Sequence, residues 1–173
     1  EEEIVVAPER TRDQRVDVSV LQEGHVLGSC TLSYQSMAAA ILQESLTRGE
    51  ALSTPQDAAK FLQMALANEK NEHFAVLFLN NKHQVLSFER LFFGTVDGAT
   101  VHPRIVVQKA LEWNAASVIL AHNHPSGHCE PSQADRDVTQ QLVKALSLID
   151  VRVLDHLVVS QSGWESLSRR GWV

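Results

Sequence analysis

Two histidines and an aspartate, separated by a short loop, could together bind a metal ion. His122 and His124 flank one residue at the end of 116–124, an apolar run typical of a buried strand. Side chains two apart in a strand point to the same side, so both imidazoles can reach one ion. Asp135 follows His124 by eleven residues, at the start of a predicted helix. Two nitrogens and one carboxylate suit Zn²⁺ and leave a fourth position for water, as in catalytic zinc sites.

The same stretch has an explanation without a metal. Ser132 and Asp135 stand as Ser-x-x-Asp directly after Pro131, a pattern close to a helix capping box. An aspartate in the first turn is also favoured by the helix dipole, and a His-x-His pair alone is a weak motif. The two interpretations are compatible, because a cap can also fix the direction of a metal ligand.

The composition limits the class of protein. The 173 residues are 44% hydrophobic and 21% charged, with a net charge of −6, which fits one globular domain with an added arm. This acidic balance argues against strong autonomous binding of nucleic acid. The sequence has no signal segment and no apolar run near the roughly 18 residues of a membrane helix. With two cysteines, Cys30 and Cys129, a disulfide scaffold is excluded, so we expect a cytoplasmic protein without membrane association.

Helical and strand patterns alternate from residue 53 onward. We predict helices at 53–68, 102–115 and 132–150, and strands at 72–80, 84–93, 116–124 and 151–161. This order predicts a mixed α/β sandwich with helices on both faces of a sheet. We expect residues 162–173 to form a short tail.

The N-terminal part is predicted to be an extension of this domain. Residues 1–15 are polar, and we expect them to be poorly ordered at their start. Strands are predicted at 16–22 and 26–32, followed by a helix at 36–49. The predicted division is therefore an N-terminal extension, 1–52, and a main domain, 53–173.

The loop also carries a family resemblance. "HNHPSG" and "PSQAD" at this spacing resemble the signature of the JAMM (JAB/MPN) metalloproteases. More closely, "FFGTVDGAT" through "DVTQQL" (92–142), followed by "VRVLDHLVVS", resembles the RadC family, over residues 53 to about 171. The resemblance implies a JAB/MPN, cytidine-deaminase-like fold. The helix-hairpin-helix-like segment of full-length RadC proteins has no clear copy here, so we expect the short RadC-like type of mobile elements.

The resemblance implies a role for each motif residue. It makes His122, His124 and Asp135 the zinc ligands. Ser132 matches the motif serine, which would hydrogen-bond the developing oxyanion or the water. The upstream glutamate of the family, at the junction of a helix and a buried strand, corresponds to Glu72, which would act as general base.

Several other polar residues compete for a role. Glu89, on the next strand, is the alternative base, and spacing alone cannot decide non-local geometry. A ligand histidine usually donates its second N–H to an acceptor; Asp155 is a candidate, and a strand-end pair with His156 is equally compatible. Three residues of the loop are expected to be bystanders: His128, Cys129 and Glu130. Three histidines are expected at the surface: His25, His73 and His83. Three tryptophans are expected to be packing residues: Trp113, Trp164 and Trp172.

These patterns and the resemblance together favour one function. We expect a zinc-dependent hydrolase that cleaves an amide, peptide or isopeptide bond in a peptide or isopeptide-linked protein. One alternative is a non-catalytic MPN-like interaction module. The other is an accessory protein of DNA repair, the process after which the RadC family is labelled.

Overall fold

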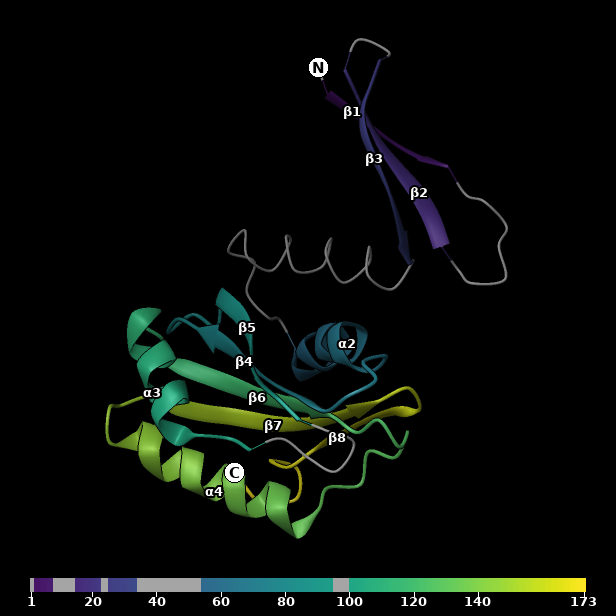
Figure 1. The fold of residues 1–173 in the computed structure, drawn as a ribbon. Coiled ribbons are helices and arrows are strands. Elements are labelled where there is room, and N and C mark those ends of the chain that lie inside the picture. The colour runs from purple at the N-terminus through teal and green to yellow at the C-terminus, as the bar shows by residue number, and fades with distance from the viewer. Residues whose placement is uncertain (1, 8–14, 23–24, 34–53, 95–99) are drawn as a thin grey trace. The chain divides into compact units, whose positions relative to one another are not determined.

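The structure is a computed structural model that describes residues 2–7, 15–22, 25–33, 54–94 and 100–173 (Figure 1). The chain divides into two compact units, Glu1–Ile41 and Leu42–Val173. The predicted boundary at 52/53, the predicted helix at 36–49 and residues 95–99 lie outside the described residues.

The first unit contains a three-stranded antiparallel sheet. Its strands are β1 (Glu2–Ala7), β2 (Arg15–Gln22) and β3 (His25–Ser33), in the order β1-β2-β3. The strands predicted at 16–22 and 26–32 are confirmed. Glu2–Ala7, for which no strand was predicted, pairs with β2 along its whole length. The β-branched run Ile4–Val6 favours a strand, and β2 offers it a partner.

The second unit is a mixed sheet between helices, as predicted. Its helices are α2 (Pro55–Leu66), α3 (Pro103–Glu112) and α4 (Gln133–Ser147). Its strands are β4 (His73–Leu79), β5 (Val85–Phe93), β6 (Ser117–Asn123), β7 (Arg152–Ser160) and β8 (Gly163–Ser166). The order is β5-β4-β6-β7-β8, and β6 and β7 form the parallel pair.

The C-terminal segment contains a strand where we predicted a tail. Gly163–Ser166 forms β8, which returns along β7 through a tight turn after Ser160. Asp155 on β7 secures this return, because its carboxylate accepts hydrogen bonds from the Ser166 hydroxyl (2.6 Å) and the Ser168 N–H (3.0 Å). A side chain outside the segment thus stabilises a strand that is too short to give a clear pattern in the sequence.

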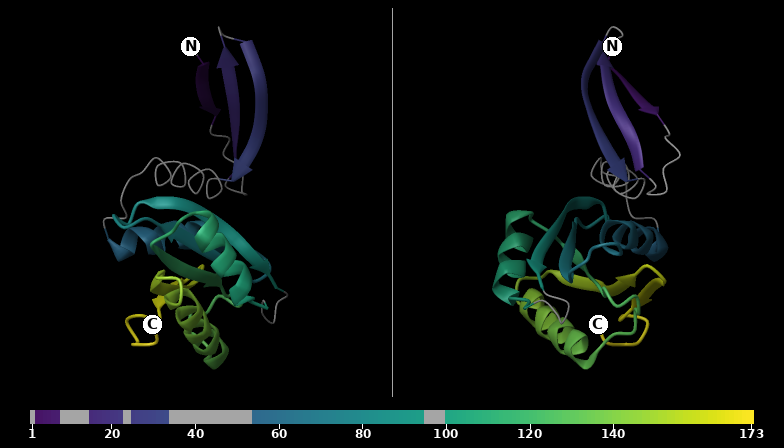
Figure 2. Two further views of the ribbon diagram at one scale, coloured as in Figure 1. Left: turned by 90° about the vertical axis from the view of Figure 1, so that its left-hand side faces the viewer. Right: turned by 45° about the vertical axis from the view of Figure 1, so that its right-hand side comes forward.

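Helices cover both faces of this sheet (Figures 1 and 2). On β4, Ala75, Leu77 and Leu79 belong to the apolar cluster beneath α2, and Phe74, Val76 and Phe78 belong to the cluster beneath α3 and α4. Since alternate residues face opposite layers, a strand covered on both sides must be apolar throughout. This explains the unbroken run in β4. None of the helices in the described segments combines the length and apolar character needed to span a membrane.

Strand alternation also decides where His122 lies. Val118 and Leu120 on β6 face the α3/α4 layer, so His122, two residues further, faces it as well. His122 is opposite Phe74 in the β4–β6 register, and the two rings stack at 6.2 Å between centroids. The first histidine of the motif is therefore fully buried and lies on the face of the sheet that α4 covers.

Candidate metal centre

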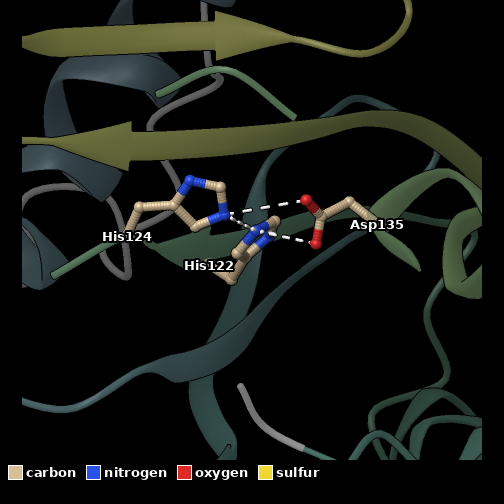
Figure 3. Close-up of side chains that lie close together, drawn as sticks. All are labelled: His122, His124 and Asp135. Carbon is tan, nitrogen blue, oxygen red and sulfur yellow. Dashed lines mark hydrogen bonds and ion pairs between the residues drawn. The ribbon is translucent and has the colours of Figure 1, made fainter. Parts of the chain in front are cut away.

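The three predicted ligands come together at the end of β6. The ligand atoms of His122, His124 and Asp135 all lie within 4.8 Å of one another (Figure 3). The His122 Nε2 atom is 3.0 Å from His124 Nε2 and 3.1 Å from Asp135 Oδ1, and His124 Nε2 is 3.6 Å from Asp135 Oδ2. Residues separated by up to thirteen positions thus converge on one point.

The start of α4 directs Asp135 toward the histidines. Ser132 caps the helix in a full capping box, in which Asp135 Oδ2 accepts from the Ser132 N–H (2.6 Å) and hydroxyl (2.7 Å). The second oxygen, Oδ1, remains on the side of His122. The capping interpretation and the metal interpretation therefore hold together, because the cap fixes the direction in which the carboxylate points.

The loop after β6 orients the second histidine. His124 Nδ1 lies 3.0 Å from the main-chain oxygen of His128, and a carbonyl can only accept, so Nδ1 carries the hydrogen. The Nε2 atom of the neutral ring is then an electron-pair donor directed at the other two residues. Gly127 has φ +86°, a left-handed conformation that glycine adopts readily, within the turn that brings His128 back. His128 therefore contributes through its backbone, although its side chain is outside the cluster.

The partner of His122 on its other side was not identified from the sequence. His122 Nδ1 is 2.8 Å from Nε2 of His156, which is fully buried, and His156 Nδ1 contacts the hydroxyl of Thr139 on α4. Asp155, the acceptor that we considered, instead accepts hydrogen bonds from Ser166 and Ser168 and from the backbone N–H of His156. It faces the opposite side of β7 from His156, since neighbouring strand residues alternate. The alternation that placed His122 could have identified His156, but the register between β6 and β7 was needed as well.

The electrostatics of the cluster favour bound positive charge. Burial raises the pKa of Asp135, but its interactions with the neighbouring His122 and His124 rings outweigh burial and leave this pKa well below its usual range. The hydrogen bond to Asp135 raises the pKa of His124, and the charge of Glu72 adds to the increase. Burial lowers the pKa of His156, with a further contribution from the neighbouring His122. The carboxylates of Asp135 and Glu72 would also stabilise a cation bound between His122, His124 and Asp135.

The cluster lies in the wall of an open cavity of about 890 Å³. Glu72 is in that wall, directly before β4, and so are His122, His124, Ser132 and Asp135. The competing Glu89 is elsewhere: its carboxylate accepts from the Trp113 indole and pairs with Lys109 at 3.3 Å. Of the two glutamates considered as base, Glu72 is the one that shares a cavity with the cluster.

The residue between the two histidines fixes the segment that carries Glu72. Asn123 is fully buried, and its amide donates to the main-chain oxygens of Asn71 (3.0 Å) and Glu69 (3.4 Å). Its side-chain oxygen accepts from the His73 N–H at 2.7 Å. The bonds to residues 71 and 73 bracket Glu72, so a single side chain sets the position of Glu72 relative to both histidines.

Several expected bystanders have structural roles. Glu130 is not an unpaired loop charge: Arg170 donates to both of its oxygens (2.6 and 2.8 Å), which lowers the pKa of Glu130. Arg170 and Arg136 lie over the ring of Trp172, at 5.6 and 5.2 Å. His73 is partly buried rather than a surface residue, because it lies on β4. Cys129 is outside the three-residue group.

The donor set fits Zn²⁺. Two imidazole nitrogens and a carboxylate oxygen are ligands that zinc accepts, and three protein ligands facing an open cavity are the composition of catalytic zinc sites. Hard cations such as Mg²⁺ or Ca²⁺ prefer sites built from oxygen atoms. Each imidazole is also held by an outer partner, as is common for metal-binding histidines.

A mixed five-stranded sheet between helices, with this group at the end of β6, is consistent with a JAB/MPN domain. The family model described as RadC-like JAB domain matches residues 52–172. The chain belongs to this family, as the motif resemblance predicted.

Curated relatives agree with the family assignment. A UPF0758 protein of Alcanivorax borkumensis is 55% identical over 132 residues, which are 76% of this chain and 59% of that protein. A UPF0758 protein of Vibrio cholerae is 53% identical over 136 residues, covering 79% and 85% of the two chains. One of Thioalkalivibrio sulfidiphilus is 57% identical over 121 residues, 70% of this chain and 54% of that protein. Since the chain spans 59% of the length of the Alcanivorax relative, this similarity concerns a part of that protein.

Proposed function

We propose that the protein is a zinc-dependent hydrolase of JAMM type that cleaves an amide, peptide or isopeptide bond. The observation that carries the proposal is the convergence of His122, His124 and Asp135 beside Glu72 in one open cavity. The outer hydrogen bonds on both imidazoles support it, because they present nitrogen lone pairs to the centre of the cluster.

In this proposal Glu72 moves the proton and the three ligands hold the metal. Zinc, when bound, supplies a Lewis acid that lowers the pKa of water to about 7. The Glu72 carboxylate accepts a proton from a water molecule in the cavity and later transfers it to the leaving amine. Asn123 supports this role, because its bonds to residues 71 and 73 restrict the backbone of Glu72.

The hydroxyl hydrogen of Ser132 can be donated either to Asp135 or to a substrate oxyanion, but not to both at once. In the structure its hydroxyl donates to Asp135 Oδ2 at 2.7 Å, so it positions a metal ligand. The role of stabilising a developing oxyanion, which the family resemblance implies, requires the same hydrogen to turn toward the substrate. We propose that Ser132 positions Asp135 in the resting protein, and that the oxyanion contact forms only with substrate present.

The substrate that we propose is a peptide or an isopeptide-linked protein. The proposal is supported by the wall of the cavity, which offers both apolar and polar side chains to a peptide: Phe74, Val101, Pro125, Val138, Lys70, Thr100 and Ser126. The acidic composition supports the expectation that nucleic acid is not a strong autonomous ligand.

The metal is tested first. The metal-free chain, titrated with Zn²⁺ against a chromophoric chelator, should bind one ion, and His124→Ala should abolish this binding. His124 is a suitable position because it is partly exposed, so its loss leaves the core intact. Absence of a zinc site in the wild-type chain, or unchanged affinity in His124→Ala, contradicts the proposal.

Glu72 is tested by separating metal binding from turnover. With a substrate from a peptide and isopeptide screen, Glu72→Gln should keep zinc and lose about 10²- to 10⁴-fold in kcat, the usual contribution of a general base. Glu89→Gln is the matched control, since Glu89 bonds to Trp113 and Lys109 outside the cavity, and it should keep wild-type kcat. Full activity of Glu72→Gln would remove Glu72 from the mechanism.

A further inference from the structure

The buried side of His122 contains a short chain of polar groups within an apolar layer. His156 on β7 and Thr139 on α4 are both completely buried, and Phe74 packs edge-on against the His156 ring at 5.4 Å between centroids. Such groups are costly inside a core unless their hydrogen bonds are satisfied. Here they are satisfied by one another and by the backbone of Asp135, which suggests a role beyond packing.

The direction of each hydrogen bond in this chain follows from its far end. Thr139 Oγ1 contacts the main-chain oxygen of Asp135, and because a carbonyl has no hydrogen, the single hydroxyl hydrogen of Thr139 must lie between them. Toward His156 Nδ1 the hydroxyl can then only accept. The hydrogen of the His156 ring therefore lies on Nδ1.

The same reasoning extends to the metal ligand. The ring nitrogens of His156 contact a hydroxyl and another imidazole, not a carboxylate, and a charged imidazolium at a fully buried position would be poorly stabilised. A neutral ring with its hydrogen on Nδ1 has a lone pair on Nε2. His122 must then donate from Nδ1 across the 2.8 Å contact, which leaves the lone pair of His122 Nε2 directed at His124 and Asp135.

We infer that Thr139 and His156 are positioning residues that fix His122 with its hydrogen on Nδ1, so that Nε2 is ready to bind a metal ion. The inference rests on the proposed zinc site. It adds a function to two residues outside the His-x-His and Ser-x-x-Asp motifs. This series of hydrogen bonds ends on the main-chain oxygen of Asp135. The start of α4 therefore orients two of the proposed ligands: Asp135 through the helix cap, and His122 through Thr139 and His156.

A valine at position 139 separates this role from packing. Thr139→Val keeps the shape of the side chain and removes the oxygen that accepts from His156. In the zinc-loaded variant the hydrogen on His156 Nδ1 would then be buried without a partner. In the metal-free variant His156 can instead carry its hydrogen on Nε2 and donate it to His122, which avoids this cost. Thr139→Val should therefore weaken Zn²⁺ binding about 10-fold or more, within the range known for outer partners of metal-binding histidines.

Two control variants complete the zinc titration. Thr139→Ser keeps the hydroxyl and should restore affinity to within about 3-fold of wild type, below the outer-partner range. Leu142→Val trims a buried side chain one turn further along α4 and should lower stability without changing zinc affinity. Equal affinity in Thr139→Val and wild type, or an equal loss in Leu142→Val, overturns the inference.

The ring hydrogens can be located without any metal. Long-range ¹H–¹⁵N NMR of the metal-free chain near neutral pH should place the His156 hydrogen on Nδ1 in wild type and Thr139→Ser, and on Nε2 in Thr139→Val. A hydrogen on Nε2 in wild type overturns the inference. If the wild-type protein binds no zinc, the proposed function fails. The ring tautomers still decide whether the hydrogen bonds from Thr139 through His156 to His122 run in the inferred direction.

Discussion

In the described part of the second unit, α2 and α4 each begin with a capping box, and the two boxes have nearly the same local geometry and different surroundings. At α2, Asp57 Oδ2 accepts from the Thr54 N–H (3.0 Å) and hydroxyl (2.8 Å). At α4, Asp135 Oδ2 accepts from the Ser132 N–H (2.6 Å) and hydroxyl (2.7 Å). The difference is in the other carboxylate oxygen. Asp57 is exposed, whereas Asp135 directs Oδ1 at His122.

Each cap also borders a cavity, and the contents of the two cavities differ. The cavity beside α2, of about 410 Å³, includes Thr54 and Pro55 but not the His122–His124 pair. The cavity beside α4 contains both histidines and Glu72. A capping box is therefore a local device that stabilises a helix start, and it becomes part of a candidate metal-binding group only where the sheet brings histidines beside it. Comparing matched variants at the two boxes tests this distinction.

The largest expected difference is in metal binding. Asp135→Asn keeps an oxygen for the cap and removes the charge, so we expect Zn²⁺ affinity to fall by more than about 100-fold, beyond the range of outer partners. Asp57→Asn makes the same change at α2 and should leave affinity unaltered. Isothermal titration of both variants measures this. Retained zinc binding in Asp135→Asn would mean that the two boxes are equivalent and that Asp135 is only a cap.

A smaller difference is expected when the capping hydroxyls are removed. Ser132→Ala and Thr54→Ala should each lower the free energy of unfolding of the metal-free chain by about 0.5–2 kcal/mol, the usual value of an N-cap. Only Ser132→Ala should also weaken zinc binding, because its hydroxyl holds Asp135 Oδ2. Chemical denaturation in chelator gives the first quantity and zinc titration the second. Parallel behaviour of both variants in both assays would dissociate the cap from the metal centre.

The smallest difference concerns pH in the metal-free chain. The depressed pKa of Asp135 stabilises the fold above the unfolded pKa of about 3.9, and this contribution is lost as pH falls through the folded pKa. The raised pKa of His124 stabilises the fold below about 6.5, and this contribution is lost as pH rises through its folded pKa.

The stability gap between wild type and Asp135→Asn should therefore be greatest between about pH 4 and 6.5, and amount to at most about 1 kcal/mol, the scale of ion pairs that water can reach. Denaturation across this pH range measures it. Asp57→Asn serves as the reference, because within the described residues its carboxylate bonds only to Thr54. A maximum outside this window would contradict the assigned pairing.

Much of the second unit could be predicted from local patterns, and its exceptions have physical reasons. The unbroken run of β4 and the start of α2 at Pro55 follow from strand alternation and from the preference of proline for a first helical turn. The strand at Gly163–Ser166 was missed because a four-residue strand held by Asp155 has little signal of its own. The strand at Glu2–Ala7 was missed because its charged first residues concealed a β-branched run.

The sequence by itself determined the residue types of the centre, the caps and the order of the elements, because these depend on spacing along one chain. Only the tertiary structure decided that Glu72 rather than Glu89 shares the cavity, and that His156 rather than Asp155 supports His122. Both decisions depend on the registers that β4 and β7 take beside β6. A register is set by packing across the whole sheet, and a shift of one residue would turn each of these side chains to the opposite face.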